Sequence, residues 1–384
     1  MSQEKQNKLW GLYIHIPFCV SKCRYCAFYS IPSPSPDLAG RFISALAREM
    51  EFYRDCGPFD TVYLGGGTPS VLKTAQIESI LRFVRRNFRI GPGAEITVEA
   101  NPADVDLRYA AALLGMGVNR LNLGVQSFAA DVLQYLGRRH SPREAVASVE
   151  AAREAGFRNL GLDLIYSIPG QKWEQWRNTL THAVSFRPEH LSCYELTLEP
   201  GTPLAEEFRR LPRRRARCRE EDETGAFLEN TSAALEEQGY IHYEVSNFSL
   251  PGRESRHNRK YWDHTPYLGL GPAAHSFHGR RRWWNMSSVE GYAAAILAGS
   301  RPVEGGEELT DEQMGMETLF LGLRTSRGVA AADLAEYGLD LPANKNNVLA
   351  ACRRDGLVFL EDGRIRPTPK GMAVADALAR DLLS

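Results

Sequence analysis

Residues 11–30 read GLYIHIPFCVSKCRYCAFYS, and three cysteines lie within eight residues of this segment. The apolar run over residues 12–16 predicts a β-strand, and Pro17 ends it because proline cannot donate a hydrogen bond to a neighbouring strand. The cysteines follow at the spacing C-x3-C-x2-C, as Cys19, Cys23 and Cys26. The pattern predicts three thiolates on one short loop at the end of a strand.

Three thiolates on one loop are typical of an iron–sulfur site. A [4Fe–4S] cluster is normally held by cysteine thiolates, and three of them would leave one iron open to another ligand. Structural zinc is the rival interpretation, but it prefers four Cys or His ligands in closely spaced pairs, and the sequence has no second pair. Cysteines also occur simply as small buried hydrophobic residues, although such tight grouping disfavours that. We therefore expect a [4Fe–4S] cluster.

The cysteine loop resembles that of the radical S-adenosylmethionine (SAM) superfamily. The sequences HIPFC and CRYC narrow the likeness to the coproporphyrinogen-oxidase-like family. The resemblance implies that SAM chelates the open iron, and that the reduced cluster cleaves SAM to a 5′-deoxyadenosyl radical. The spacing of the cysteines does not by itself imply this chemistry.

Length and composition set broad limits on the class of protein. A chain of 384 residues exceeds a typical single core, so we expect one large and one smaller domain. The formal net charge of −1 gives no general attraction to nucleic acid or membranes. No signal-peptide pattern and no apolar run of membrane-spanning length occurs in the sequence. We expect a cytoplasmic protein that binds no nucleic acid.

The first half of the chain alternates between apolar strand patterns and helical patterns. After the first strand, we expect strands over residues 61–64, 96–100, 120–125, 160–165 and 191–196. Helices are expected over residues 37–53, with Asp37 as the cap, 74–87, 105–115, 141–155 and 173–185. Six βα units predict an α/β fold with a parallel sheet. The pattern leaves a closed barrel, a partial barrel and an open sheet possible, and the resemblance selects a partial (β/α)6 radical SAM barrel.

Polar and glycine-rich segments follow several of these strands. Ligands of such folds bind at the carboxyl ends of the strands, and glycines let the backbone approach a ligand closely. The segment GGGTP could equally be a tight turn, Glu99 a solvated carboxylate, and Asp163 a helix cap. The family resemblance assigns SAM contacts to Tyr13, Tyr25, Gly66, Gly67, Thr68, Glu99, Gln126, Arg138 and Asp163.

The segment HNRKYW at residues 257–262 is the second unusual motif. It could be a capped turn with aromatic packing. It also matches HNxxYW, a motif associated with haem binding in the haem-chaperone subgroup HemW. An imidazole can ligate haem iron, and aromatic rings offer flat apolar surfaces. The resemblance therefore makes haem-site candidates of His257, Asn258, Tyr261 and Trp262, with His264, His275 and His278 close by.

The tail reads as a compact unit. Three helical patterns and a hairpin turning at Asp362 and Gly363 predict a small winged-helix-like α/β domain. Winged helices often bind DNA, but the balanced charge does not support a basic recognition face, so a lid or partner surface is expected. We divide the chain into a partial-barrel core (1–200), a family-specific extension with the HNxxYW segment (201–306) and this winged-helix-like domain (307–384).

Members of this family have two different functions, as an oxidase and as a haem chaperone. The oxygen-independent coproporphyrinogen III oxidase decarboxylates propionates, and its pattern has a fourth cysteine where this chain has Phe28. Only twelve residues precede Tyr13, whereas the oxidase has a long N-terminal extension. Both differences favour the HemW subgroup, whose members bind cluster, SAM and haem and deliver haem to acceptor enzymes, with membrane-associated acceptors among the candidates. Another tetrapyrrole-acting radical SAM enzyme is the third alternative.

Overall fold

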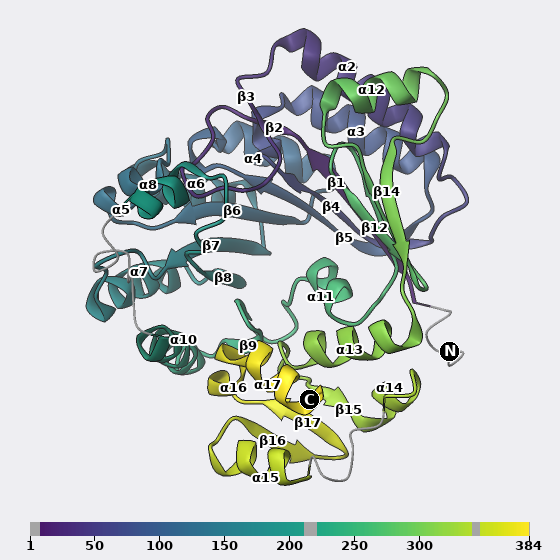
Figure 1. Cartoon of the computed structure of the whole chain (residues 1–384). Coiled ribbons are helices and arrows are strands. Elements are labelled where there is room, and N and C mark those ends of the chain that lie inside the picture. Colours follow the sequence, from purple (N-terminus) through teal and green to yellow (C-terminus); the bar gives the residue numbers. More distant parts are fainter. Residues whose placement is uncertain (1–7, 211–220, 340–345, 384) are drawn as a thin grey trace.

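The computed structural model describes residues 8–210, 221–339 and 346–383 (Figure 1). In these ranges twelve strands form one sheet, in the order β14-β13-β12-β11-β1-β4-β5-β6-β7-β8-β10-β9. A three-stranded sheet belongs to the C-terminal part of the chain. Among the described residues, none of the helices has the length and apolar character that a membrane crossing requires.

The six expected βα units form the centre of the sheet, where all neighbouring strands are parallel. The strands are β1 (Trp10–Ile16), β4 (Phe59–Gly66), β5 (Ile90–Ala100), β6 (Arg120–Gln126), β7 (Leu160–Tyr166) and β8 (His190–Glu195). The helices between them are α2 (Pro36–Glu51), α3 (Thr74–Asn87), α4 (Leu107–Gly115), α5 (Ala130–Leu136), α6 (Pro142–Ala155) and α7 (Trp173–Ser185). The prediction of an α/β fold built on six parallel strands is confirmed.

The sheet does not close on itself, because other strands cover both edges of the parallel core. Beside β1 lie β11 (Tyr267–Leu270), β12 (His275–His278), β13 (Arg281–Asn285) and β14 (Val303–Glu308). Beside β8 lies β10 (Asn247–Ser249), which is antiparallel to it, and β9 (Ile241–Glu244) follows, antiparallel to β10. Residues 241–308 therefore extend the sheet at both edges and leave the barrel partial.

One detail of the predicted helices is wrong. The cap of α2 is Ser35 and not Asp37, since the Ser35 hydroxyl accepts from the backbone N–H of Leu38 at 3.1 Å. Pro36 then occupies the first turn, where proline needs no hydrogen-bond partner for its nitrogen. Asp37 lies in that first turn and complements the positive end of the helix dipole.

Alternation along the strands separates an apolar layer from a polar interior. In β1, Leu12, Ile14 and Ile16 are fully buried in one core cluster with residues of α2. Tyr13 and His15 point to the opposite face, because successive strand residues alternate between faces. Tyr13 meets Tyr63 of β4 there, with ring centroids 6.2 Å apart. The strands thus line the barrel interior with polar side chains.

The C-terminal domain has its own core around Leu319, Val329 and Leu378. Its elements are α13 (Asp311–Gly322), β15 (Val329–Ala330), α14 (Ala331–Ala335), α15 (Asn346–Arg354), β16 (Val358–Glu361), β17 (Arg364–Pro367), α16 (Pro369–Ala373) and α17 (Ala375–Leu383). The strands β16 and β17 form the predicted hairpin, with positive φ at Asp362 and Gly363. The arrangement is winged-helix-like, as expected, and lies below the barrel in Figure 1.

A buried carboxylate joins α2 to the added strands. Oε2 of Glu49 accepts from the Tyr292 hydroxyl at 2.7 Å and from the Gly271 N–H at 2.8 Å, while Oε1 accepts from Nδ2 of Asn285 at 2.6 Å. Glu49 has no exposed surface. The contact therefore ties α2, the loop after β11, β13 and α12 (Val289–Leu297) into one body.

We expect Glu49→Ala to lower the free energy of unfolding by about 3 kcal/mol. Three buried donors would lose their acceptor, and each unsatisfied buried group costs roughly 1–3 kcal/mol before the structure relaxes. Urea denaturation followed by circular dichroism measures the change. The matched control is Glu51→Ala on the same helix, where the carboxylate is exposed and pairs with Arg54. Equal stabilities for the two variants would contradict this role of Glu49.

Candidate cluster and cofactor site

The three predicted cluster ligands lie on a loop held between two short strands. Cys19 ends β2 (Phe18–Cys19), which pairs with β3 (Ile31–Pro32) on the other side of the loop. Cys19 is buried, whereas Cys23 and Cys26 are half-buried. The loop follows directly from the carboxyl end of β1, where ligands of parallel α/β folds bind.

The thiols do not have the arrangement of a single-ion site. In the described ranges, no three Cys, His, Asp or Glu side chains gather around one point. In a cubane cluster each thiolate binds its own iron, so the sulfur atoms do not converge on one point. Burial raises the pKa of the Cys26 thiol, and the neighbouring Cys23 and Cys19 raise it further. The three sulfur atoms are therefore neighbours in one site without converging on one ion.

A half-buried arginine, Arg138, supports the cysteine loop. Nη1 of Arg138 donates to Sγ of Cys23 at 3.2 Å, and Nη2 donates to the carbonyl of Gly124 at 2.6 Å. Burial alone would lower the pKa of Arg138, but Tyr25 and Cys23 hold it above its usual value. The thiolate is the form of cysteine that binds metal, and the guanidinium lies against the sulfur that would carry this negative charge. The residues present thus fit a thiolate-ligated cluster.

The glycine turn after β4 packs tightly against the start of the cysteine loop. The N–H of Gly67 donates to the carbonyl of Ile16 at 2.8 Å, and that of Thr68 donates to the carbonyl of Phe18 at 2.7 Å. The N–H of Gly66 donates to Oε2 of Glu99 at 3.3 Å. These three N–H groups are already used, so the turn is left with oxygen acceptors, which suit the amino group of a ligand.

Two carboxyl groups lie in the barrel interior beside this turn. Burial raises the pKa of Glu99 to about 7, and the nearby charge of Asp163 raises it as well. A hydrogen bond from the Tyr63 hydroxyl, at 2.6 Å, acts in the opposite direction and lowers this pKa. Burial likewise raises the pKa of Asp163 to about 6, and Ser192 and Arg120 oppose this rise. Neighbouring carboxyl groups with perturbed pKa values are typical of ligand sites.

The side chain of Gln126 has a buried oxygen that lacks a hydrogen-bond donor among the described residues. Gln126 ends β6 with a φ of +64°, an unusual backbone conformation for a residue other than glycine. Its Oε1 atom is buried and has no hydrogen-bond partner among the described residues. Buried polar atoms are nearly always satisfied, so an orphaned amide oxygen fits a cofactor that would supply a donor.

Two further residues complete the interior, and the sequence patterns did not single them out. Nδ1 of His15 lies 3.0 Å from the Tyr13 hydroxyl, and Nε2 lies 2.9 Å from the carbonyl of Tyr29. His15 therefore ties β1 to the far end of the cysteine loop. Tyr63 donates to Glu99 from the neighbouring strand. Strand alternation is the signal that would have found both, because each lies on the same face as a predicted site residue.

The HNxxYW segment lies at the other end of the barrel. It forms α11 (Arg256–Trp262), and its His257 lies against Gly11 of β1, Thr61 of β4 and Glu95 of β5, which are neighbours across the sheet. Gly11 and Ile16 are five positions apart on β1, or roughly 17 Å at about 3.3 Å per residue. Figure 1 shows α11 between the sheet and the C-terminal domain. The structure thus places the predicted site residues in two groups.

His257 is firmly held inside the barrel. Its Nδ1 lies 2.8 Å from Oγ1 of Thr61 and its Nε2 lies 2.9 Å from the Tyr261 hydroxyl. The ring stacks on Tyr63 with centroids 5.0 Å apart. Burial lowers the pKa of His257 to about 3, so the imidazole is neutral. Both ring nitrogens have partners, and iron ligation would require Nε2 to leave Tyr261.

The other residues of the motif face different surroundings. The Asn258 N–H donates to the Ser255 hydroxyl, which caps α11. Trp262 lines a cavity between α11 and the C-terminal domain. Nε2 of His264 lies 3.3 Å from a carboxylate oxygen of Glu317, while His275 and His278 are exposed on β12.

Comparisons with known proteins agree with this architecture. A family model described as the radical SAM superfamily matches residues 13–183, and one described as the HemN C-terminal domain matches residues 309–374. The solved Escherichia coli coproporphyrinogen III oxidase HemN, described as a radical SAM enzyme, has a similar fold, with a TM-score of 0.81 and 25% sequence identity over 98% of this chain and 90% of that chain. The fold and the cysteine loop are thus those of a radical SAM protein of the coproporphyrinogen-oxidase type.

Full-length relatives define the family more narrowly. The chain is 36% identical to the haem chaperone HemW of Mycobacterium tuberculosis over 97% of this chain and 95% of the relative. It is 34% identical to that of Bacillus subtilis, over 94% and 95%, and 36% identical to that of Escherichia coli, over 69% of each chain. The chain belongs to the HemW family.

Proposed function

We propose that this protein is a HemW-like haem chaperone that binds a [4Fe–4S] cluster, SAM and haem and delivers haem to haem-dependent enzymes. The observation that carries the proposal is the identity of 34–36% to proteins named haem chaperone, extending along nearly the whole chain. The oxidase shares the fold at lower identity. Where the oxidase pattern has its fourth cysteine, this chain has Phe28, which is 68% exposed and offers no ligand.

The cofactors are assigned to the carboxyl end of the barrel. Cys19, Cys23 and Cys26 would hold the cluster, which when bound offers SAM one open iron position. The SAM contacts carried over from the family are Tyr13, Tyr25, Gly66, Gly67, Thr68, Glu99, Gln126, Arg138 and Asp163. The orphaned oxygen of Gln126 and the acceptor-rich glycine turn support this assignment.

Haem is assigned to the region of α11, where His257, Asn258, Tyr261 and Trp262 are the candidate residues that the motif supplies. The aromatic contacts from His257 to Tyr63, and from Tyr63 to Tyr13, connect this region with the interior that would receive SAM. In our proposal residues 1–200 hold cluster and SAM, residues 201–306 contribute the haem segment, and residues 307–384 form a lid or partner surface. Haem-dependent enzymes, including membrane-associated ones, would receive haem in the cytoplasm.

Loss of a polar SAM contact is expected to weaken SAM binding about tenfold without loss of the cluster. We choose Asp163→Ala, and Gln126→Asn because asparagine tolerates the positive φ at this position. One buried hydrogen bond left unmade costs roughly 1–3 kcal/mol. Isothermal calorimetry on cluster-reconstituted protein measures the affinity, with the exposed Gln134→Ala on α5 as the control. Wild-type affinity in both variants would refute the assigned SAM site.

The chaperone and the oxidase differ in one simple assay. Cluster-reconstituted protein is incubated anaerobically with coproporphyrinogen III, SAM and a reductant, and the porphyrins are separated after oxidation. The chaperone proposal predicts that coproporphyrinogen stays unconverted. Formation of protoporphyrinogen in proportion to enzyme turnover would decide for the oxidase.

A further inference from the structure

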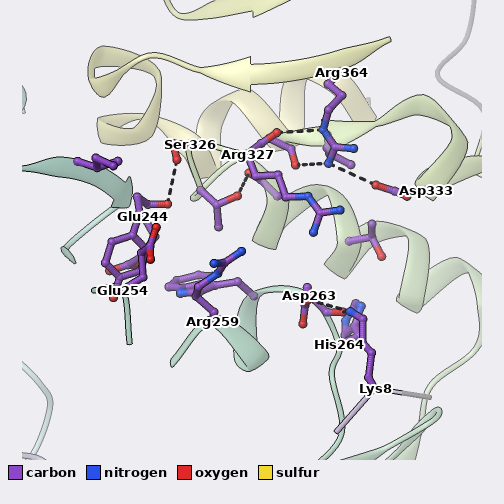
Figure 2. Close-up of a pocket in the computed structure, with 18 residues that line it drawn as sticks. Lys8, Glu244, Glu254, Arg259, Asp263, His264, Ser326, Arg327, Asp333 and Arg364 are labelled. Carbon is purple, nitrogen blue, oxygen red and sulfur yellow. Dashed lines mark hydrogen bonds and ion pairs between the residues drawn. The ribbon is translucent and has the colours of Figure 1, made fainter. Parts of the chain in front are cut away.

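A cavity of about 220 Å³ lies on the outer side of α11. One wall consists of α11 and the end of β9, and the opposite wall consists of the end of α13, the loop before β15, and Arg364 of β17 (Figure 2). The cavity therefore lies at the seam between the barrel and the C-terminal domain. Main-chain hydrogen bonds hold this seam, including Val245 N–H to the Arg324 carbonyl at 2.8 Å.

The HNxxYW helix divides its side chains between the barrel and this cavity. His257 and Tyr261 are four residues apart and share the inner face, where they contact each other. Arg259 and Trp262 are three residues apart, and both line the cavity. Burial and hydrogen bonding account for the inner pair, whereas the side chains of Arg259 and Trp262 make no hydrogen bond or ion pair with any residue that the structure describes.

Two guanidinium groups line this cavity, and no carboxylate of the described residues pairs with either of them. Arg259 on α11 and Arg327 on the loop before β15 point into the cavity from opposite walls (Figure 2). Neither makes an ion pair within the described ranges, whereas Lys8 pairs with Asp263 and Arg364 approaches Asp333. Such a cluster of like charges is stabilised when an anion lies between them.

The carboxyl groups on the walls do not neutralise these arginines. Glu244 is buried, and burial raises its pKa to about 7, so much of it is protonated at neutral pH. One of its oxygens, Oε1, has no hydrogen-bond partner among the described residues. Glu254 also lines the cavity. Neither Glu244 nor Glu254 forms an ion pair with Arg259 or Arg327 in the part of the chain that the structure describes, so both guanidinium groups can take up an added anion.

We propose that the propionate edge of a tetrapyrrole binds in this cavity, with its carboxylates between Arg259 and Arg327 and its ring edge against the indole of Trp262. Guanidinium groups bind carboxylates through paired hydrogen bonds, and an indole offers a flat apolar face. This inference rests on the proposed haem-chaperone function. It places haem on the outer face of α11 and not against the buried ring of His257.

The size of the cavity adds a consequence for haem transfer. Pockets that enclose a whole drug-sized ligand measure about 300–1,000 Å³, so a cavity of about 220 Å³ receives the edge of a macrocycle. The opposite edge then stays outside the seam. A haem held in this way remains within reach of an acceptor protein.

Haem and haem dimethyl ester, whose propionates carry no charge, are the probes that test the inference. Each is titrated anaerobically into cluster-reconstituted wild type and into the double variant Arg259→Gln/Arg327→Gln, and binding is followed by absorbance. The control is Arg41→Gln on α2, an exposed arginine that pairs with Asp37 far from the seam. We expect the double variant to bind haem at least tenfold more weakly, and wild type to bind the ester as weakly as the variant binds haem.

The outcomes separate this inference from the proposed function. If wild type and double variant bind haem equally well, or if wild type binds the ester as tightly as haem, haem binds but not through this cavity. If wild type binds no haem, the chaperone function fails and the inference fails with it. The ester experiment uses only wild-type protein, so it decides the matter even if the double variant does not fold.

Discussion

Cys19→Ala, Cys23→Ala and Cys26→Ala are each expected to abolish the iron–sulfur cluster. Three protein thiolates are the minimum that keeps three irons of a cubane in place, so the loss of one leaves two irons without a protein ligand. The loop offers no substitute, because Phe28 occupies the only nearby position where the oxidase pattern has a cysteine. Iron and acid-labile sulfide, measured after anaerobic reconstitution, should fall to background in all three variants.

Cys56→Ala is the matched control for these measurements. Cys56 is a half-buried free thiol that follows α2, away from the cysteine loop. Its replacement should leave iron, sulfide and the visible absorbance of the cluster unchanged. Wild-type iron and sulfide content in the three loop variants would refute the cluster assignment, whereas loss of the cluster in the control alone would move it elsewhere in the chain.

Gly67→Ala is expected to disrupt the cysteine loop from the neighbouring strand. A Cβ at Gly67 would lie 2.5 Å from the carbonyl oxygen of Phe18 and 2.8 Å from that of Ile16. Both atoms belong to the backbone immediately before Cys19, so no flexible side chain can move aside. The shift should weaken SAM binding by at least about tenfold, equivalent to about 1.4 kcal/mol, and reduce the yield of cluster.

Gly40→Ala provides the control for this substitution. Gly40 lies within α2, and a Cβ there would meet no atom within 4 Å. Alanine should therefore stabilise the helix by up to about 1 kcal/mol and leave SAM affinity and cluster content at wild-type values. SAM calorimetry and iron analysis compare the two variants directly. Equal results would mean that the turn does not depend on the close backbone contact at Gly67.

The central fold could be predicted because its signals are local. The helix over residues 74–87 matches α3 at both ends, and the strand over 61–64 lies within β4. In these segments apolar periodicity and turn residues agree with the packing. The same agreement made the hairpin at Asp362 and Gly363 predictable.

The edge strands could not be predicted from such signals. Strand β14 reads VEGGEE and is mostly exposed, so it has no apolar alternation. Its pairing with β13 depends on partners that lie about twenty residues earlier in the chain. The motif match also singled out HNxxYW without indicating that its residues separate into an inner and an outer face. That separation arises from contacts of α11 with Gly11, Thr61 and Glu95, which are distant in sequence.

The two groups of candidate site residues lie at opposite ends of the barrel strands. The cysteine loop and the orphaned Gln126 lie at the carboxyl ends of the strands, whereas α11 lies at their amino ends. The rings of Tyr13, Tyr63 and His257 occupy the interior between them.

Titration of haem into anaerobic, cluster-reconstituted protein tests directly whether this chain is a haem chaperone. Absorbance is followed as haem is added, and unbound haem is removed by gel filtration before the bound fraction is measured. A haem chaperone should show saturable, near-stoichiometric binding and a spectrum distinct from that of free haem. Absent or unsaturable binding by protein with an intact cluster would contradict the assignment of this chain as a haem chaperone.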